Sequence, residues 1–351
     1  MPVPAMKKYE LHTKSGDSAI LTGEPFEKLQ EHTEGRRIVI LTDEHVYDLH
    51  GDRFPEVPVL RIPPGEQAKS LGRATLLYGE LVRLGMDRSD MLVAAGGGVV
   101  CDLGGFVAAT YQRGIGLGFV PTTLLAQVDA AIGGKNGVNL GEYKNMVGTF
   151  RQPSFVLADP DFLKTLPREE FVSGLAEVVK YGLISDPEIL ELLEGKTPGE
   201  IAGDRELLDE LIERSVRVKV EVVSRDEEDH GLRRILNFGH TYGHGIERLY
   251  DLPHGQAVAW GMMVALDFSV QTGLAQENLK ERILGLLKKL QLLPELHPDR
   301  EKVMELIAHD KKRKGDKIPY VLVKEAGETV IMPLTPQEIV HLLENMKPFT
   351  A

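Results

Sequence analysis

Two short, β-branched apolar runs constrain the fold of this chain more than any other feature. The run RIVILT occupies residues 37–42 and is followed by Asp43, and the run MLVAA occupies residues 91–95 and continues into Gly96-Gly97-Gly98. Apolar runs of this length without alternation are typical of parallel strands buried on both faces. Between them, leucines recur at helical spacing over residues 71–84. Strand and helix therefore alternate, which predicts a doubly wound α/β domain.

The texture of the sequence changes near residue 159, where amphipathic helical stretches begin and strand signals become few. A chain of 351 residues also exceeds the ~100–200 residues of an ordinary domain. We therefore expect an α/β domain over residues 1–158 and a mainly α-helical domain over residues 159–351. Thr165 is a suitable cap for the first of these helices, which would carry Glu177.

Charge and composition exclude several classes of partner. The formal net charge of -12 would repel a nucleic-acid backbone or an anionic membrane surface, so neither partner is expected. The chain has one cysteine, Cys101, and no run of eighteen apolar residues, which favours an unanchored cytoplasmic enzyme. Because the overall charge is acidic, clustered Lys and Arg side chains indicate binding of an anion.

A glycine-rich strand end suggests a phosphate site. Gly96-Gly97-Gly98 follows a strand and precedes a helix that should begin near Val99, where unpaired N–H groups could hold a pyrophosphate. The G-x-G-x-x-G spacing is absent, so a tight structural turn is an equal alternative. Asp43 could bind ribose hydroxyls or cap a helix. Thr122 and Thr123 follow another strand, where their hydroxyls could face a ligand or cap a helix.

The stretch RRILNFGHTYGHG contains the strongest chemical signal. Arg233, Asn237, His240 and His244 recur at spacings of four, three and four, which would align them on one face of a helix. A guanidinium, an amide and two imidazoles do not make a core face. The glycines in the same stretch would each cost about 1 kcal/mol against alanine, so they indicate a close approach by another group.

Three histidines and one carboxylate indicate a metal site. His254 lies ten residues beyond His244, at the entrance to another helix, and Glu177 lies among apolar neighbours on an earlier helix. A catalytic zinc ion typically takes three ligands from His, Glu or Asp and keeps one open position. The spacing alone does not decide which of the histidines would be ligands.

Several lysines occupy positions that a core does not require. Lys180 shares a helical face with Glu177, which an ordinary salt bridge would also explain. Lys219 falls on an apolar stripe and would need an anionic partner if its segment is helical, although the alternating valines of this segment also permit a strand. Lys135 and the pair Lys144-Asn145 lie on glycine-rich sequence.

Eight motifs in a fixed order resemble the 3-dehydroquinate synthase family. They run from about Pro64 to about Lys312 and read PGEQAK, GGGVVCDLGG, PTTLLAQVDAAIGGKNGVN, KNMVGTF, GLAEVVKYG, LNFGHTYGH, HGQAVAWGM and HDKK. The first sixty residues match less well, and Asn136 and Cys101 replace residues that are more usual in the family. The resemblance implies an NAD-binding first domain and a second domain that binds metal and substrate.

The resemblance also implies a role for individual residues. Zinc or cobalt would be held by Glu177, His240 and His254, and His244 would serve the substrate and its proton network. Arg113 would reach the phosphate site of the partner subunit in a homodimer. NAD would be contacted by Asp43, Glu66, Lys69, Gly97, Gly98, Val99, Asp102, Thr122, Thr123, Leu125, Asp129, Lys135, Lys144, Phe162 and Thr165. The substrate would be bound by Lys135, Asn145, Lys180, Lys219, Arg233, Asn237 and Lys311, and Asp129 and Lys144 would lie near the nicotinamide side.

The implied reaction converts 3-deoxy-D-arabino-heptulosonate 7-phosphate to 3-dehydroquinate and phosphate. It combines oxidation with NAD, phosphate elimination, reduction, ring opening and intramolecular aldol closure. Two alternatives remain. One is another sugar-phosphate cyclase, of the amino-dehydroquinate or 2-epi-5-epi-valiolone type, and the other is a metal-dependent alcohol dehydrogenase like glycerol dehydrogenase.

Overall fold

The computed structural model describes residues 6–141, 143–311 and 317–346 and divides into two compact units. The first unit runs to Phe171 and also includes Leu208–Glu228, and the second comprises Val172–Leu207 and the chain from Asp229 onward. This division differs from the expected one at residue 158, because most of helix α7 (Arg205–Arg225) belongs to the first unit. Residues 208–228 pack with a unit whose other residues come earlier in the chain, and the composition of the sequence does not reveal such a return.

The first unit is built on a seven-stranded sheet whose order is β1-β2-β9-β6-β5-β3-β4. Its central strands are parallel, and only β1 and β2 form an antiparallel pair. The strands are β1 (Lys7–Thr13), β2 (Gly16–Thr22), β3 (Ile38–Asp43), β4 (Val59–Ile62), β5 (Met91–Gly96), β6 (Gly116–Pro121) and β9 (Phe155–Ala158). The two apolar runs became β3 and β5, which are buried throughout. The predicted doubly wound α/β fold is confirmed.

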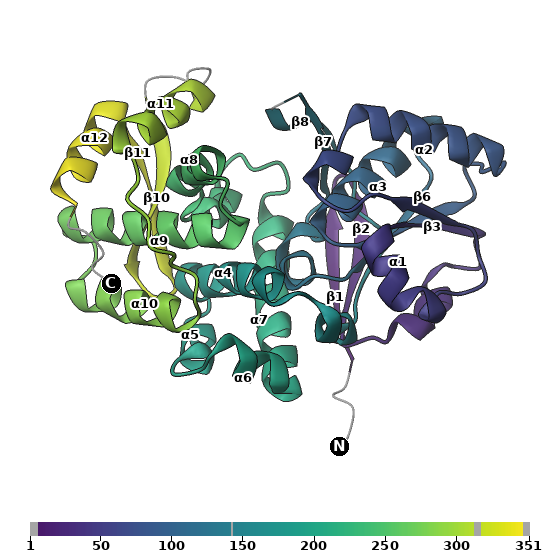
Figure 1. The fold of residues 1–351 in the computed structure, drawn as a ribbon, viewed down its shortest axis with the longest axis horizontal. Helices are drawn as coiled ribbons and strands as arrows, with labels where there is room; N and C mark the ends of the chain where they lie inside the picture. The colour runs from purple at the N-terminus through teal and green to yellow at the C-terminus, as the bar shows by residue number, and fades with distance from the viewer. Residues whose placement is uncertain (1–5, 142, 312–316, 347–351) are drawn as a thin grey trace. The chain divides into compact units, whose positions relative to one another are not determined.

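Three helices follow strands of this sheet, as Figure 1 shows: α1 (Glu44–His50), α2 (Leu71–Arg83) and α3 (Gly98–Thr110). Asp43 caps α1, where its Oδ1 accepts a hydrogen bond of 2.9 Å from the Val46 N–H. Ser70 caps α2 in the same way. Since parallel strands share one carboxyl edge, the residues after β3, β5, β6 and β9 all lie along it.

A separate hairpin, β7 (Lys135–Leu140) and β8 (Tyr143–Phe150), contacts α2 and α3. Asn136 anchors the hairpin, because its buried amide nitrogen donates to the carbonyls of Gly134 and Arg151 at 2.9 Å each. A Cβ on Gly105 of α3 would lie 1.8 Å from Asn136 Oδ1, so this close packing requires glycine. The position at which Asn136 departs from the resembled family is therefore a structural contact.

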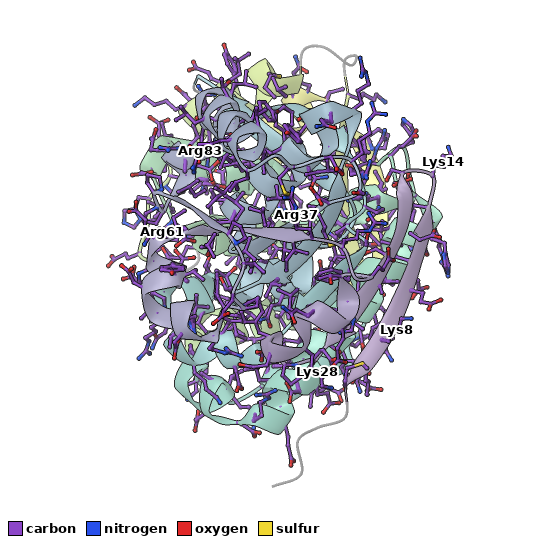
Figure 2. The ribbon with its side chains drawn as sticks, turned by 90° about the vertical axis from the view of Figure 1, so that its right-hand side faces the viewer. Lys8, Lys14, Lys28, Arg37, Arg61 and Arg83 are labelled. Carbon is purple, nitrogen blue, oxygen red and sulfur yellow. The ribbon has the colours of Figure 1, made fainter. Side chains whose placement is uncertain are left out.

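Six basic side chains of the first unit are labelled in Figure 2, and each lies near a carboxylate or an aromatic ring. Four of the six cations labelled there lie within 3.5 Å of a carboxylate, Lys14 lies 3.9 Å from Glu228, and the Arg61 guanidinium stacks over the Tyr47 ring. These six side chains do not build the uncompensated positive surface that a phosphate backbone requires. None of the helices in the described part of the chain has the length and apolar character of a membrane span.

The second unit is mostly helical, with one hairpin that the sequence did not suggest. Its helices are α4 (Arg168–Ile184, of which Val172 onward belongs to this unit), α5 (Glu188–Leu193), α6 (Pro198–Gly203), α8 (His240–Tyr250), α9 (His254–Gln271), α10 (Glu277–Lys289), α11 (Arg300–Lys311) and α12 (Pro336–Asn345). The antiparallel strands β10 (Ile318–Glu325) and β11 (Glu328–Leu334) form the hairpin. Helix α9 is buried along most of its length and contacts α8, α10 and β10, so it is the core of this unit.

A buried ion pair joins α9 to α10. Lys280 Nζ lies 2.9 Å from Asp267 Oδ1, and Asp267 Oδ2 accepts a 2.6 Å hydrogen bond from Gln271, which also donates to the Leu342 carbonyl of α12. If Asp267 is replaced with alanine, the buried ammonium of Lys280 keeps Glu277, which is half-exposed, as its carboxylate partner. We expect a loss of about 3 kcal/mol in the free energy of unfolding, measured with urea. Asp48→Ala on the surface of α1 is the control, and a loss below about 1 kcal/mol would contradict this role for Asp267.

Candidate active site

The histidine-rich stretch is a short 3-10 turn followed by a new helix, which corrects the expectation of one continuous helical face. The turn η7 covers Leu232–Asn237, and Gly239 then takes a left-handed conformation with φ 78° before α8 begins at His240. A residue with a side chain would be strained at this φ. The break turns His240 and His244 away from the direction that a straight helix from Arg233 would give them.

Close packing of α8 and α4 against α9 brings three candidate ligands together. A Cβ on Gly243 of α8 would lie 2.8 Å from the Ala257 carbonyl, and a Cβ on Gly255 would lie 2.2 Å from the Ser173 carbonyl of α4. The group that approaches these glycines is therefore a neighbouring helix. The Gly255 N–H also donates to Ser173 Oγ at 2.9 Å, which ties the start of α9 to α4.

Glu177, His240 and His254 converge on one point in the second unit. Glu177 Oε1 lies 3.6 Å from His240 Nε2 and 3.4 Å from His254 Nε2, and the three ligand atoms lie within 4.8 Å of one another. Glu177 is fully buried and forms an ion pair with Lys180, which is also buried. One carboxylate oxygen and two imidazole nitrogens at this separation suit a tetrahedral metal ion with an open position.

The opposite ring nitrogens of the two histidines are oriented by hydrogen bonds. His240 Nδ1 lies 3.1 Å from the Phe238 carbonyl, and His254 Nδ1 lies 3.2 Å from Glu247 Oε2. Nδ1 therefore carries the proton in each neutral ring. The lone pair of Nε2 then points toward Glu177 and is available to a metal ion. Glu247 was not predicted as a site residue, although it lies one helical turn after His244 on α8.

The environments of the two histidines move their pKa values in opposite directions. Burial lowers the pKa of His240 to about 3, so its imidazole is neutral at physiological pH. Burial also lowers the pKa of His254, but Glu177 and Glu247 outweigh it and raise this pKa to about 9. In the metal-free protein, His254 therefore carries a proton that a metal ion must displace.

Zinc affinity should depend on pH through this proton. The raised pKa of His254 stabilises the metal-free fold fully below its ordinary value of 6.5, and this contribution is lost as pH rises through about 9. Metal binding has the opposite dependence, so we expect zinc affinity to rise about tenfold per pH unit between about 6.5 and 9 and then to level off. Titration against a competing chelator at each pH measures it, and an affinity independent of pH would contradict the protonated state of His254.

Glu247 should strengthen the metal site without being a ligand of the ion. Glu247→Ala removes the carboxylate that orients His254, and we expect zinc affinity to fall about 10–100-fold at pH values where His254 is neutral in both proteins. Glu281→Ala, on the exposed face of α10, is the matched control. Equal affinities of the Glu247→Ala variant and the unmodified protein would show that this contact has no part in metal binding.

The remaining candidates of the second unit surround this cluster unequally. The ring of His244 is exposed and lies 5.1 Å from that of His240, measured between centroids. His244 also forms, with Glu247 and His254, a second group of side chains that could hold a metal ion. Arg233 is buried in η7, and Asn237 is exposed at its end. Lys311 is the last residue of α11, and its side chain lies outside the described residues, as does the whole of Lys312.

In the first unit, the glycine triplet ends at an open helix N-terminus. Gly97 is the N-cap of α3 and supplies no side-chain cap, so the first-turn amides of α3 are not covered by a capping side chain. A Cβ on Gly97 would lie 3.1 Å from Thr123, and a Cβ on Gly98 would lie 3.4 Å from Ala130. This surface of backbone N–H groups is what a pyrophosphate requires.

The neighbouring candidates of the carboxyl edge have structural roles as well. Asp43 caps α1, and Thr123 Oγ1 accepts a 3.2 Å hydrogen bond from the Ala126 N–H, so the capping alternatives hold for both. Thr122, which precedes Thr123 in the chain, is buried. Val99, in the first turn of α3, and Leu125, in the helical turn after Thr123, are half-buried. Capping leaves the other oxygen of Asp43 available for a further hydrogen bond.

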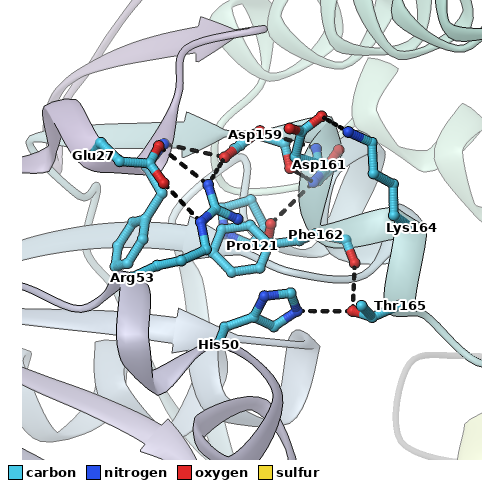
Figure 3. A network of polar contacts seen from close by, with 11 residues as sticks. Glu27, His50, Arg53, Pro121, Asp159, Asp161, Phe162, Lys164 and Thr165 are labelled. Atoms are coloured by element: carbon cyan, nitrogen blue, oxygen red, sulfur yellow. Dashed lines mark hydrogen bonds and ion pairs between the residues drawn. The ribbon is translucent and has the colours of Figure 1, made fainter.

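A network around Arg53 supports the segment after β9 (Figure 3). The guanidinium of Arg53 lies 2.6 Å from Asp159 Oδ2 and 2.7 Å from Glu27 Oε1, and it stacks over the Phe162 ring at 4.7 Å. Thr165 does not cap α4 as expected. Its hydroxyl lies 3.2 Å from the Phe162 carbonyl and 2.7 Å from His50 Nε2, and burial lowers the pKa of His50. The network holds Phe162 and Thr165 in place.

Two buried lysines of the first unit pair with carboxylates. Lys69 forms an ion pair with Asp102 of α3, and Lys219 forms one with Asp129. Burial raises the pKa of Asp102, and the neighbouring Lys69 opposes this shift. The segment of Lys219 is helix α7, which excludes the strand alternative, and Asp129 is the anionic partner that its inward position required.

The other candidates of the first unit are exposed. Lys135 begins β7, Lys144 and Asn145 lie on β8, and Glu66 lies in the turn before α2. Arg113 is exposed, with a left-handed backbone at φ 69°.

Two family models match consecutive parts of the chain. The model of the 3-dehydroquinate synthase N-terminal region matches residues 59–173, and that of the C-terminal region matches residues 174–313. This chain belongs to the 3-dehydroquinate synthase family. A curated 3-dehydroquinate synthase of Symbiobacterium thermophilum is 44% identical over 329 residues, which cover 90% of this chain and 92% of that protein.

Two solved structures resemble the structure of this 3-dehydroquinate synthase family member over nearly its whole length. A 2-epi-5-epi-valiolone synthase from Streptomyces hygroscopicus subsp. jinggangensis 5008, with NAD+ and Zn2+ bound, is 28% identical with a TM-score of 0.85, covering 95% of this chain and 97% of its own. A 2-deoxy-scyllo-inosose synthase in complex with carbaglucose-6-phosphate, NAD+ and Co2+ is 26% identical with a TM-score of 0.83, covering 96% and 99%.

Proposed function

We propose that this chain is a 3-dehydroquinate synthase that converts 3-deoxy-D-arabino-heptulosonate 7-phosphate to 3-dehydroquinate and phosphate. The observation that carries the proposal is the convergence of Glu177, His240 and His254, in a chain that the two family models match from residue 59 to residue 313. The curated relative of the same name, 44% identical over most of both chains, supports it.

The donor sets fit both expected cofactors. Glu177, His240 and His254 would hold zinc or cobalt, because their ligand atoms converge and their outer nitrogens are already hydrogen-bonded. The uncapped start of α3 suits the pyrophosphate of NAD, with Asp43, Thr122, Thr123, Phe162 and Thr165 along the same edge. When bound, NAD supplies a reversible hydride acceptor and the metal ion supplies a Lewis acid. NAD and zinc or cobalt in the solved relatives support this assignment.

The side chains of the chain itself would bind and orient the substrate. The buried guanidinium of Arg233 suits bidentate contact with a carboxylate or phosphate, and Lys180 adds a buried positive charge in the same unit. Asn237 and His244 offer hydrogen bonds to hydroxyl groups, and exposed His244 can exchange protons with solvent. In the first unit, Lys135, Asn145 and Lys219 would bind the remaining oxygens, with Asp129 holding Lys219 in position.

We also propose a homodimer in which Arg113 reaches the partner's phosphate site. Large apolar side chains that are exposed in the first unit support an interface there, and they include Leu76 and Val82 on α2 and Tyr143 and Met146 on β8. Light scattering of the purified protein tests this, and a monomer at micromolar concentration would refute it. The cytoplasmic location remains a prediction.

A substrate comparison separates this function from the rival cyclases. The planar guanidinium of buried Arg233 suits bidentate contact with the carboxylate of the proposed substrate, which a neutral sugar does not offer. We expect turnover of 3-deoxy-D-arabino-heptulosonate 7-phosphate and at least about a hundredfold lower kcat/KM for a seven-carbon sugar phosphate without the carboxylate. Preference for the neutral sugar would favour a valiolone-type cyclase, and net release of NADH would favour a dehydrogenase.

A further inference from the structure

The hairpin of the first unit contains an irregularity at Asn139. Val138 pairs with Val147 and Leu140 pairs with Tyr143, and the register shifts between them, so Asn139 stands outside the regular ladder. Such bulges redirect a side chain and are frequent next to active sites. The position of Asn139 within the sequence motif GGKNGVN gives no sign of this.

The backbone of Asn139 pairs with the turn before α2 instead. Its N–H donates to the Lys69 carbonyl at 2.9 Å, and Asn139 and Ser70 form an isolated parallel bridge. Lys69 in turn forms the ion pair with Asp102 of α3. Asn139 is therefore connected to the helix whose N-terminus is the proposed pyrophosphate site.

Both ends of the Asn139 side chain are used. Its Nδ2 donates to Glu66 Oε1 at 2.8 Å, and its Oδ1 accepts from the Asn145 N–H at 2.8 Å. The orientation of the amide follows from its partners, because a carboxylate only accepts and a backbone N–H only donates. Neither an aspartate nor a leucine could make both contacts.

Asn145 has a left-handed backbone conformation, with a φ of 54°. Few non-glycine residues adopt this conformation, and asparagine tolerates it better than most. The hydrogen bond from its N–H to Asn139 is a contact that holds it. The exposed side chain of Asn145 is one of the proposed substrate ligands.

We propose that Asn139 is a positioning residue that couples the two proposed binding sites of the first unit. Its amide nitrogen holds the Glu66 carboxylate in position for the cofactor, and its amide oxygen holds the backbone of Asn145 in position for the substrate. This inference rests on the proposed function for the roles of Glu66 and Asn145. Asn139 would act through these two residues, because both ends of its amide are hydrogen-bonded to them.

Two substitutions in the full-length, zinc-loaded protein separate the two halves of the amide. Asn139→Asp keeps the acceptor for the Asn145 N–H but places a carboxylate against Glu66, so we expect NAD affinity to fall about tenfold while the substrate KM changes less than about twofold. Asn139→Leu removes both contacts. We expect both NAD affinity and substrate KM to worsen about tenfold, and hydrogen exchange of the Asn145 amide to accelerate. Asn278→Asp on α10 is the control for the change in charge.

A rescue experiment distinguishes positioning from a general loss of stability. In a Glu66→Gln background, the introduced glutamine amide can donate to the introduced aspartate, so Asn139→Asp should cost less than about twofold in NAD affinity there. The same tenfold loss in both backgrounds, or unchanged exchange of the Asn145 amide in Asn139→Leu, would overturn the proposal. NAD affinity and amide exchange need no turnover, so these results stand even if the wild-type protein fails to convert the proposed substrate.

Discussion

Replacing His240 with alanine is expected to lower kcat by at least about a thousandfold and to reduce zinc affinity by a larger factor than the loss of Glu247 does. His240 is neutral because of its burial, and its Nε2 lies 3.6 Å from Glu177 Oε1, so it can bind a metal ion without first losing a proton. Removing it leaves two of the three ligands that a catalytic zinc ion requires. Steady-state kinetics and chelator titration measure the two effects.

The control for this variant is His341→Ala, which removes an exposed imidazole on α12. Both variants should retain the thermal unfolding midpoint of the wild-type protein in the absence of metal, within a few degrees. A His240→Ala variant that still binds zinc with wild-type affinity would show that the ion is held by other residues. The alternative site is formed by His244, Glu247 and His254.

Replacing Arg233 with methionine should lower kcat/KM about 10²–10³-fold. The guanidinium is buried in η7 and would form a charge-assisted, bidentate contact with the substrate, and loss of one partner of such a buried pair costs several kcal/mol. Arg233→Lys should recover only part of the loss, because an ammonium group lacks the planar pair of donors. The measurement is kcat/KM for the phosphorylated substrate with and without its carboxylate.

The matched control is Arg234→Met, since this neighbouring side chain is only half-buried in the same turn. If Arg233 binds the carboxylate, the Arg233→Met variant should lose little activity toward the substrate that lacks it. Equal losses toward both substrates would instead assign Arg233 to the phosphate or to a structural role.

The sequence predicted the parts of the fold that depend on local pattern. Uninterrupted apolar runs became β3 and β5, and the glycine triplet precedes α3, because burial on both faces and helix N-termini leave clear local signals. The residue types alone indicated a metal site made of Glu177 and some of the three histidines, and the resemblance to the 3-dehydroquinate synthase family implied that His240 and His254 are the ligands.

The sequence failed where the outcome depends on contacts between distant residues. The spacing of Arg233, Asn237, His240 and His244 is that of one helical face. In the structure, the left-handed Gly239 separates the 3-10 turn η7 from helix α8. Asn139 contacts Glu66 across 73 positions, and no local pattern reports such a pair. The hairpin β10–β11 was likewise missed, because short strands are weak signals among helices.

The most direct test of the proposed function is turnover of 3-deoxy-D-arabino-heptulosonate 7-phosphate by the purified protein with zinc and a catalytic amount of NAD. Phosphate, 3-dehydroquinate and NADH absorbance are followed together. The proposed function predicts equal amounts of phosphate and 3-dehydroquinate, in excess over NAD, with no net NADH. Absence of turnover by the metal-loaded protein, or NADH formed in proportion to product, would contradict it.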